Sequence, residues 1–251
     1  MERYAIFTFE TSVKSYETDF QGSWKPACLI QNLIKAASDH ASLLGFDYAV
    51  LLERGLVWVL ARLKIRFFEI PTLKQAVTIK TWPKGIEQKL FFMRDFDVRG
   101  ADNRPLVTAS LAWLLMNPKT RRILSPQALG GSVPDNGGLS SLDELLEKIE
   151  LPDGLLDQLT VKANYSAVDL LGHANAARYV EWVCDCFLQE QYQLNRLDWL
   201  QINYSHETKP GETLSIMTGC ANDDPFQWFI QGTNQTRDLK AFEAALGWVK
   251  R

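Results

Sequence analysis

The chain carries an internal repeat, and this repeat limits the folds that it can adopt more than any other feature. An aspartate, two further residues, a glycine and then a serine or histidine occur at 19–23 and again at 169–173, an offset of 150 residues. Farther on, an isoleucine followed two residues later by an aromatic residue occurs at 65–67 and returns at 202–204, an offset of 137. The offset changes because the first copy has a longer connection between its helix and its next strand. A repeat of this kind predicts two units that share one architecture.

Each copy is predicted to contain a strand, a turn, a long helix and four further strands. Apolar residues spaced by three and four predict helices over about 26–44 and 175–190, the first with Pro26 in its opening turn. Runs rich in β-branched and aromatic residues predict strands at 4–15, 56–69, 74–82, 88–98, 105–116, 159–167, 199–208, 212–221, 226–233 and 242–250. A long helix followed by a run of strands is an α+β pattern.

The repeat also predicts the domain boundaries. We expect one domain over 1–117 and a second over 159–251. Between them, 118–158 is rich in proline and glycine and contains an acidic stretch, so it is predicted to be a surface linker with a short helix at 142–149.

Composition and charge exclude several classes of function. A net charge of -3 gives no reason to expect nucleic acid as a partner. No apolar run approaches the ~18 residues that a membrane span requires, and the start lacks the pattern of a signal or transit peptide. Four cysteines have neither zinc nor redox spacing: Cys28, Cys184, Cys186 and Cys220. We therefore expect a cytoplasmic protein with reduced thiols and with no metal or other cofactor.

The second copy of the repeated turn carries titratable side chains. Asp169 and His173 flank Gly172, which allows a tight backbone turn, and Asn175 is suited to cap the helix that follows. Amides at a helix start stabilise developing negative charge, so this turn is a candidate site for acid–base chemistry. The alternative is a capped helix with an incidental histidine, and the pattern alone leaves both interpretations open.

A longer motif around this turn resembles that of a known family. The stretch Asp169-Leu-Leu-Gly-His173-Ala-Asn175-Ala-Ala-Arg-Tyr179 is similar to the signature Asp-x-Asn-x-His-x-Asn-Asn-x-x-Tyr of the acyl-(acyl carrier protein) thioesterases of bacteria and plant plastids. The strand-like segment that ends in Glu207 resembles the family's strand before a catalytic glutamate, and Trp58-Val-Leu-Ala-Arg matches a further stretch of the first half.

This resemblance implies both a fold and a function. The family consists of two tandem hotdog domains, each an α+β unit in which a curved antiparallel sheet wraps a long helix. The first half would then serve binding or scaffolding and the second would be catalytic. The implied reaction is hydrolysis of acyl-(acyl carrier protein) to a free fatty acid, with the carrier protein as partner. The two halves would form an intramolecular pseudo-dimer, and further homodimerisation stays open.

The resemblance assigns the catalytic roles to Asp169, His173 and Glu207. In the preferred scheme Glu207 and His173 position and deprotonate a water molecule, Asp169 orients the site, and amides at the helix start polarise the carbonyl. In the other scheme Asp169 attacks the thioester as a nucleophile and forms a mixed anhydride. Strict strand alternation would place Glu207 on the polar face, unless a bulge or the following loop turns it into the site.

Two departures from the family pattern bear on activity. Leu171 stands where the signature has its first asparagine, a residue usually counted as catalytic, and leucine can neither donate nor accept a hydrogen bond. Thr208 replaces a cysteine of many plant members, which argues against a thiol nucleophile there. We therefore expect a thioesterase of reduced activity. The alternatives are a non-catalytic protein that binds acyl carriers or lipids, and an acyl-coenzyme A thioesterase.

A basic cluster in the predicted linker is a candidate docking site. Lys119, Arg121 and Arg122 could meet the acidic face of an acyl carrier protein, although a solvated loop would have the same composition.

Overall fold

The chain folds into two compact units. The computed structural model describes residues 5–221 and 223–251, so the first residue of the strand predicted at 4–15 lies outside it. The units are Met1–Leu146 and Glu147–Arg251, and the division falls within the segment that we expected to be a linker. None of the helices that the structure describes is both long and apolar enough to cross a bilayer.

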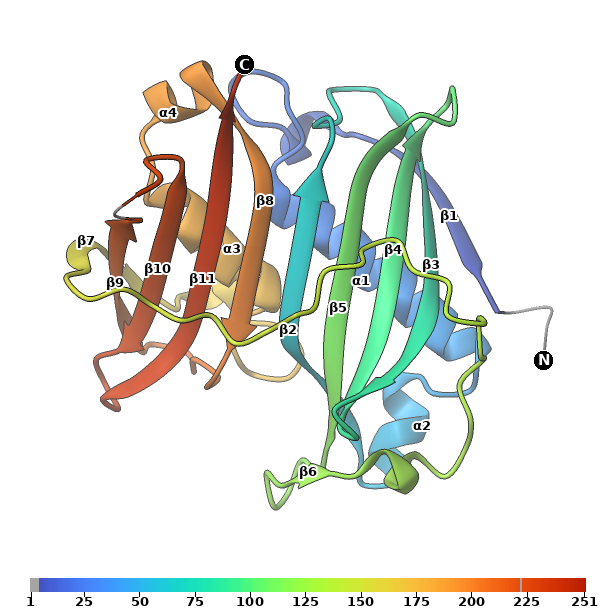
Figure 1. Ribbon diagram of the computed structural model, residues 1–251. Helices are drawn as coiled ribbons and strands as arrows, with labels where there is room; N and C mark the ends of the chain where they lie inside the picture. Colours follow the sequence, from blue (N-terminus) through green and yellow to red (C-terminus); the bar gives the residue numbers. More distant parts are fainter. Residues whose placement is uncertain (1–4, 222) are drawn as a thin grey trace. The chain divides into compact units, whose positions relative to one another are not determined.

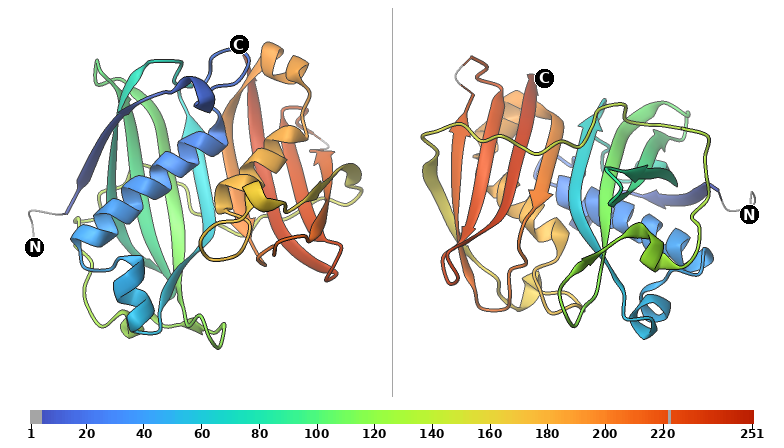
Figure 2. Two further views of the ribbon diagram at one scale, coloured as in Figure 1. Left: turned by 180° about the vertical axis from the view of Figure 1, so that it is seen from behind. Right: turned by 60° about the horizontal axis from the view of Figure 1, so that its bottom comes forward.

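The first unit is a five-stranded antiparallel sheet with one long helix against it. Its sheet has the order β1-β3-β4-β5-β2, and β6 extends it as a short partner of β5. Helix α1 lies along one face of this sheet (Figures 1 and 2) and contacts β1 and β3. The elements are β1 (Phe7–Ser12), α1 (Pro26–Leu43), α2 (Tyr48–Glu53), β2 (Val57–Phe67), β3 (Ala76–Glu87), β4 (Phe91–Gly100), β5 (Pro105–Met116) and β6 (Ile123–Leu124).

The second unit repeats this architecture. Its strands are all antiparallel and follow the same order, β7-β9-β10-β11-β8. This confirms the predicted repeat of strand, turn, helix and four strands. The elements are β7 (Leu156–Lys162), α3 (Ala176–Asp185), α4 (Gln189–Leu194), β8 (Asn195–Tyr204), β9 (Thr213–Cys220), β10 (Gln227–Asn234) and β11 (Leu239–Lys250).

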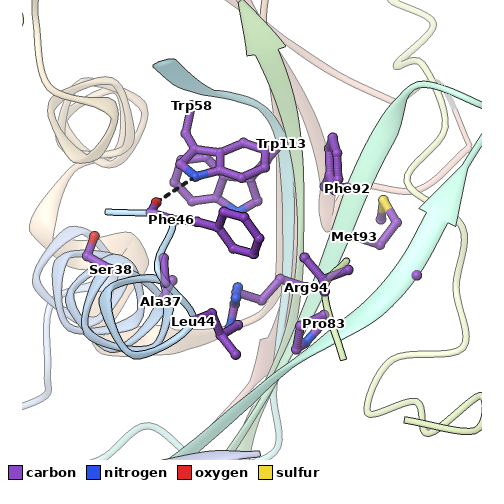
Figure 3. Close-up of a pocket in the computed structure, with 13 residues that line it drawn as sticks. Ala37, Ser38, Leu44, Phe46, Trp58, Pro83, Phe92, Met93, Arg94 and Trp113 are labelled. Carbon is purple, nitrogen blue, oxygen red and sulfur yellow. Dashed lines mark hydrogen bonds between the residues drawn. The ribbon is translucent and has the colours of Figure 1, made fainter. Parts of the chain in front are cut away.

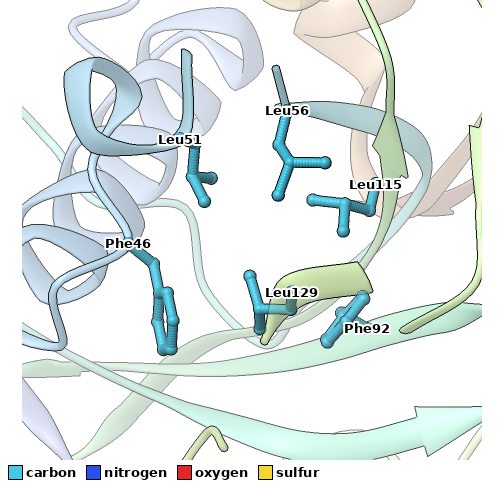
Figure 4. Close-up of a cluster of buried hydrophobic side chains, with 6 residues drawn as sticks. All are labelled: Phe46, Leu51, Leu56, Phe92, Leu115 and Leu129. Carbon is cyan, nitrogen blue, oxygen red and sulfur yellow. The ribbon is translucent and has the colours of Figure 1, made fainter. Parts of the chain in front are cut away.

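The long helix of the first unit begins at a proline, ends just before a glycine, and buries one face in the core. Proline at position N1 fixes the first turn of α1, and Gly45, with φ of +79°, follows its last residues. The buried face of α1 consists of Ala27, Leu29, Ile30, Leu33, Ala36, Ala37 and His40. A second cluster continues the core beyond the helix (Figure 4) and consists of Phe46, Leu51, Leu56, Phe92, Leu115 and Leu129.

The repeated turn has the same backbone geometry in both units. Asp19 N donates to Ser23 O at 2.9 Å, and Asp169 N donates to His173 O at 2.9 Å. The glycine in the fourth position has φ of +77° in each turn, a conformation that side chains rarely adopt. The sequence repeat is therefore a repeat of hydrogen bonds as well as of residues.

The predicted helix over 175–190 is shorter than expected. Helix α3 ends at Asp185, and α4 begins only at Gln189. Between them Phe187 makes edge-to-face contacts with Trp228 and Trp248, which turns the chain toward the sheet. The apolar spacing that suggested a continuous helix thus includes Phe187, which lies beyond the end of α3 and packs on β10 and β11.

The short helix predicted at 142–149 is absent, since the structure shows this segment as irregular chain. Side chains of the first unit take up its backbone groups instead. Asp95 Oδ2 accepts from Ser141 N at 2.8 Å, and Leu142 O accepts from Lys84 Nζ at 2.8 Å. Arg62 donates to Leu146 O at 2.5 Å. Of these three groups, Leu142 O is the one that a helix over 142–149 would have paired internally, and here the Lys84 ammonium takes that place.

We expect Asp95→Ala to destabilise the protein strongly. Asp95 is fully buried beside Lys84, whose Nζ lies 3.6 Å from Oδ2, so its removal leaves a largely buried ammonium uncompensated. Such a loss costs about 3–5 kcal/mol. Asp39→Ala is the control, because the Lys35–Asp39 pair is exposed and contributes less than ~1 kcal/mol. Urea unfolding measures both, and equal midpoints for the two variants would contradict the assignment.

Candidate active site

The turn that precedes α3 is held by the carboxylate of Asp169. Its Oδ1 accepts from Leu171 N at 2.9 Å, and Asn175 Nδ2 lies 3.4 Å from Oδ2. Asn175 also caps the helix as predicted, because its Oδ1 accepts from Ala177 N at 3.0 Å. The Asp169 carboxylate is thus engaged in building the turn.

The first unit offers a direct comparison for this role. Asp19 Oδ1 accepts from Gln21 N and Ser23 N, each at 2.9 Å, in a turn that has no histidine. An aspartate at this position therefore organises the backbone even where no acid–base chemistry is available. This favours the orienting role of Asp169 over the nucleophilic one.

The structure brings His173 and Glu207 into contact. Nε2 of His173 lies 2.9 Å from Oε2 of Glu207, and each side chain keeps 22% of its surface exposed. A carboxylate only accepts, so the contact places a proton on Nε2 of the imidazole. Both groups are partly accessible, which a pair that acts on a bound substrate requires.

The loop after β8 carries Glu207 away from the face that strand alternation would give it. Strand β8 ends at Tyr204, and the next two amides, of Ser205 and His206, both donate to Ala241 O, at 2.9 and 3.1 Å. The regular alternation stops at this irregular pairing. Glu207 therefore belongs to the loop and not to the strand, as the second of our two sequence-based options required.

One backbone hydrogen bond ties this loop to the histidine turn. Ala174 N donates to Thr208 O at 2.8 Å, and these residues directly follow His173 and Glu207. On the other side, Thr208 N donates to the hydroxyl of Tyr179 at 2.9 Å. The loop is therefore held between the turn and helix α3.

The first unit has the equivalent backbone bond without the chemistry. Trp24 N donates to Pro71 O at 2.7 Å, so Ser23 and Ile70 occupy the positions of His173 and Glu207. Isoleucine can neither accept a proton nor orient a histidine. Acid–base chemistry at this position is confined to the second unit.

Aromatic side chains pack around Tyr179, the residue that binds the Glu207 loop. The Tyr179 ring makes edge-to-face contacts with Tyr204 and Phe242, at centroid distances of 5.4 and 5.5 Å. Burial raises the pKa of Tyr179, and it also raises the pKa of Tyr204, whose hydroxyl donates to Ala176 O at 3.0 Å. Both phenols therefore stay neutral and act as fixed hydrogen-bonding groups.

Sequence reasoning missed a charged cluster that holds the Glu207 loop. Arg237, in the turn between β10 and β11, donates to Glu207 O, and its Nε lies 2.9 Å from Glu212 Oε1. Glu212 Oε2 accepts from Asn234 Nδ2 at 2.7 Å and from Lys209 N at 2.8 Å. No local motif marks Arg237, because its partners are distant in the sequence.

The remaining predicted residues lie on the surface. Leu171 has 44% of its surface exposed. Lys119, Arg121 and Arg122 are exposed on the turn between β5 and β6, where Asn117 Oδ1 accepts from Lys119 N at 2.9 Å. Within residues 5–221 and 223–251, no group of three or more histidine, cysteine or acidic side chains is placed to hold a metal ion.

Two cavities are described, and neither is lined by the His173–Glu207 pair. The first lies in the first unit between α1 and the strands of its sheet (Figure 3), and its walls are mostly apolar. The second lies in the second unit beside Cys186, Phe187 and Trp228.

We expect acid to remove the contribution of Glu212 to stability. Burial opposes its charge, but the hydrogen bonds from Lys209 and Asn234 and the Arg237 charge lower its pKa below the ordinary 4.5. A lowered pKa stabilises the fold above the ordinary value, and this stabilisation is lost as pH falls below 4.5 through the folded-state pKa. The Tm difference between wild type and Glu212→Gln should therefore shrink on acidification.

The Tm of both proteins is followed from neutral pH down to about 3. Glu190→Gln, which removes an exposed carboxylate of the same unit, is the matched control. A Tm difference for Glu212→Gln that stays constant over the series would show that the Glu212 charge does not contribute.

Comparisons with known proteins agree over nearly the whole chain. The model of the "Acyl-ACP thioesterase N-terminal domain" matches residues 5–127, and that of the "Acyl-ACP thioesterase C-terminal domain" matches residues 154–243. A crystal structure of an acyl-ACP thioesterase from Bacteroides thetaiotaomicron is 28% identical with a TM-score of 0.83, over 99% of this chain and 100% of that chain. The 12:0-ACP thioesterase from Umbellularia californica is 20% identical with a TM-score of 0.82, over 98% and 95% of the two chains.

The curated plant relatives are longer than this chain. Oleoyl-acyl carrier protein thioesterase 2 of Arabidopsis thaliana, a chloroplastic protein, is 24% identical over 242 residues, which are 88% of this chain and 65% of that protein. This chain therefore spans less than two thirds of the length of that relative. The structural likenesses confirm the fold that we expected, two tandem hotdog domains.

Proposed function

Since the chain belongs to the acyl-ACP thioesterase family, we propose that it hydrolyses the thioester of acyl-(acyl carrier protein) and releases a free fatty acid. The observation that carries the proposal is the contact of 2.9 Å between His173 and Glu207. Imidazole and carboxylate groups in contact can hold a water molecule and take its proton. The side chains that replace this pair in the first unit have no such capacity.

The proposed reaction uses water as the nucleophile. Glu207 and His173 hold the water and accept its proton while its oxygen attacks the thioester carbonyl carbon. Amides at the start of α3 stabilise the oxyanion that forms, since a helix start favours negative charge. The carbon–sulfur bond then breaks, and the thiolate of the carrier takes the proton from the site.

Attack by Asp169 is the alternative mechanism. The contacts of its carboxylate with Leu171 N and Asn175 support an orienting role for Asp169 instead, as does Asp19 in the first unit, whose carboxylate also accepts from the amide two residues on. A nucleophilic carboxylate would have to give up these contacts, and the turn would lose its support.

We expect Leu171→Asn to accelerate a slow enzyme. If the missing asparagine supplies one hydrogen bond in the transition state, its return raises kcat by about a hundred- to a thousandfold, or roughly 2.7–4 kcal/mol. Leu171 is partly exposed, so the new amide can be hydrated and carries no burial cost. Thiol release from acyl carrier protein and coenzyme A thioesters of several chain lengths measures the effect, with His173→Ala as the inactive reference.

Leu170→Asn is the matched control, because Leu170 is the adjacent leucine and is 85% exposed. It should leave the rate unchanged. If neither wild type nor Leu171→Asn releases thiol faster than His173→Ala on any substrate, the non-catalytic binding protein becomes the better interpretation. Turnover of coenzyme A thioesters alone would identify the acyl-coenzyme A thioesterase.

The basic turn between β5 and β6 is our proposed docking site for the acidic carrier protein. Lys119, Arg121 and Arg122 are all exposed there, and Asn117 fixes the turn by accepting from two of its amides. Complementary charge at the rim of an interface mainly speeds association and sets its salt dependence.

Removing this charge should weaken recognition of the carrier and leave the chemical step intact. We expect the double variant Lys119→Ser, Arg122→Ser to raise KM for the carrier-linked substrate by about 2- to 10-fold, with kcat unchanged and a weaker salt dependence. Lys80→Ser, Lys89→Ser removes the same net charge from exposed positions on β3 and its turn, so it is the control. Equal KM values for the two double variants would contradict the assignment.

The cytoplasm is the location that we propose. All four cysteines are free thiols, as is typical of proteins in a reducing compartment.

A further inference from the structure

The peptide group between Glu207 and Thr208 is held at both ends by side chains of the second unit. Its carbonyl oxygen, Glu207 O, accepts from Nη2 of Arg237, and its amide, Thr208 N, donates to the hydroxyl of Tyr179 at 2.9 Å. A peptide group is planar, so two such contacts fix its orientation beside the Cα atom of Glu207. The Glu207 side chain, whose Oε2 lies 2.9 Å from Nε2 of His173, therefore extends from a fixed group.

The next peptide group is held in the same way. Its carbonyl oxygen, Thr208 O, accepts from Ala174 N at 2.8 Å, and its amide, Lys209 N, donates to Oε2 of Glu212 at 2.8 Å. The other carboxylate oxygen of Glu212 lies 2.9 Å from Nε of Arg237. One ion pair thus holds two successive peptide groups, with the arginine at the first and the glutamate at the second.

This ion pair is largely shielded from solvent and has further support. The side chains of Arg237 and Glu212 keep 28% and 10% of their surface exposed. Asn234 is fully buried and contacts both residues, since its Oδ1 accepts from Arg237 N at 3.1 Å and its Nδ2 donates to Glu212 Oε2 at 2.7 Å. Exposed ion pairs contribute little to stability, whereas breaking a buried pair is costly. The pair is therefore a fixed part of the loop.

The first unit shows that the loop itself does not need this charge. Gln75 stands where the second unit has Glu212, at the repeat offset of 137 residues. Its Oε1 accepts from Thr72 N at 2.9 Å, as the Glu212 carboxylate accepts from Lys209 N. A neutral amide thus holds the loop through the same contact. The negative charge of Glu212 adds a strong partner for a guanidinium group.

The arginine in the corresponding turn of the first unit has a different use. Arg104, between β4 and β5, lies 3.0 Å from a carboxylate oxygen of Glu69 and 3.6 Å from one of Asp102. The three side chains keep 52%, 45% and 63% of their surface exposed, so these are surface pairs. In the second unit the arginine instead binds a main-chain carbonyl of the site itself.

We propose that Arg237, supported by Glu212, is a positioning residue that holds the Glu207 carboxylate against His173. Arg237 acts through the main chain of Glu207 and through the neighbouring peptide group. Its loss leaves Glu207 O without this donor and leaves Glu212 without its counter-charge, so the loop can turn the carboxylate away from the imidazole. The contribution to catalysis rests on the proposed function, whereas the effect on the contact between Glu207 and His173 does not.

Steady-state kinetics of Arg237→Met with an acyl-(acyl carrier protein) substrate test the proposal. We expect kcat to fall by about 10- to 100-fold with KM unchanged, because a displaced acid–base group slows the chemical step. Arg237→Lys keeps the charge but has one nitrogen, which cannot replace both Nε and Nη2, so its kcat should be intermediate. Arg251→Met is the matched control, since Arg251 donates to a main-chain carbonyl at the other end of β8, that of Asn195. It should leave kcat unchanged.

A double-mutant cycle distinguishes positioning from a general loss of structure. If Arg237 acts through Glu207, Arg237→Met should cause no further loss of kcat in the Glu207→Gln variant. A merely structural role would lower kcat by the same factor in both backgrounds, and that result would overturn the proposal. An unchanged kcat in Arg237→Met would also overturn it. All rates are measured well below the Tm of each variant, and Arg237→Lys enters the cycle if Arg237→Met fails to fold.

Crystal structures of wild type and the two methionine variants give a readout that needs no turnover. We expect Nε2 of His173 and Oε2 of Glu207 to stay in contact at 2.9 Å in wild type and Arg251→Met, and to separate in Arg237→Met. This separation in a protein that never releases thiol would refute only the proposed function. Thiol release with the contact intact in Arg237→Met would refute only the positioning role.

Discussion

The site depends on one backbone hydrogen bond, from Ala174 N to Thr208 O. It joins the residues that follow His173 and Glu207, and so it fixes the two points from which these side chains extend toward each other. Because only main-chain atoms take part, this bond can form whatever the neighbouring side chains are. The first unit has the same bond at the equivalent positions. The fold therefore supplies the geometry, and the side chains decide whether chemistry takes place there.

The two units have diverged on this shared frame. In the second unit, the turn and the loop carry a histidine and a glutamate, and a charged cluster around Arg237 holds the loop in place. In the first unit, Ser23 and Ile70 stand at the equivalent positions, and the notable charge is Arg94, which lines an apolar cavity. Two copies of one architecture thus carry different side chains at equivalent positions.

The sequence predicted those features whose signal is local or repeated. Three predicted features follow from residues that are close together in the chain. They are the succession of strand, turn, helix and four strands, the start of α1 at Pro26, and the cap at Asn175. The end of α3 could not be predicted, because it depends on the packing of Phe187 against residues of two distant strands. The contact of Glu207 with its histidine needed the family resemblance, since strand alternation favoured the opposite face. Arg237 had no signal at all.

The serine in the first turn has a further use. Ser23 shows that this turn keeps its hydrogen bonds and its left-handed glycine when histidine is replaced by a small polar residue. The first unit thus shows that the turn folds without a histidine. A His173→Ser variant copies a solution that the chain already uses, which makes it the rational choice for trapping an intact thioester in a crystal.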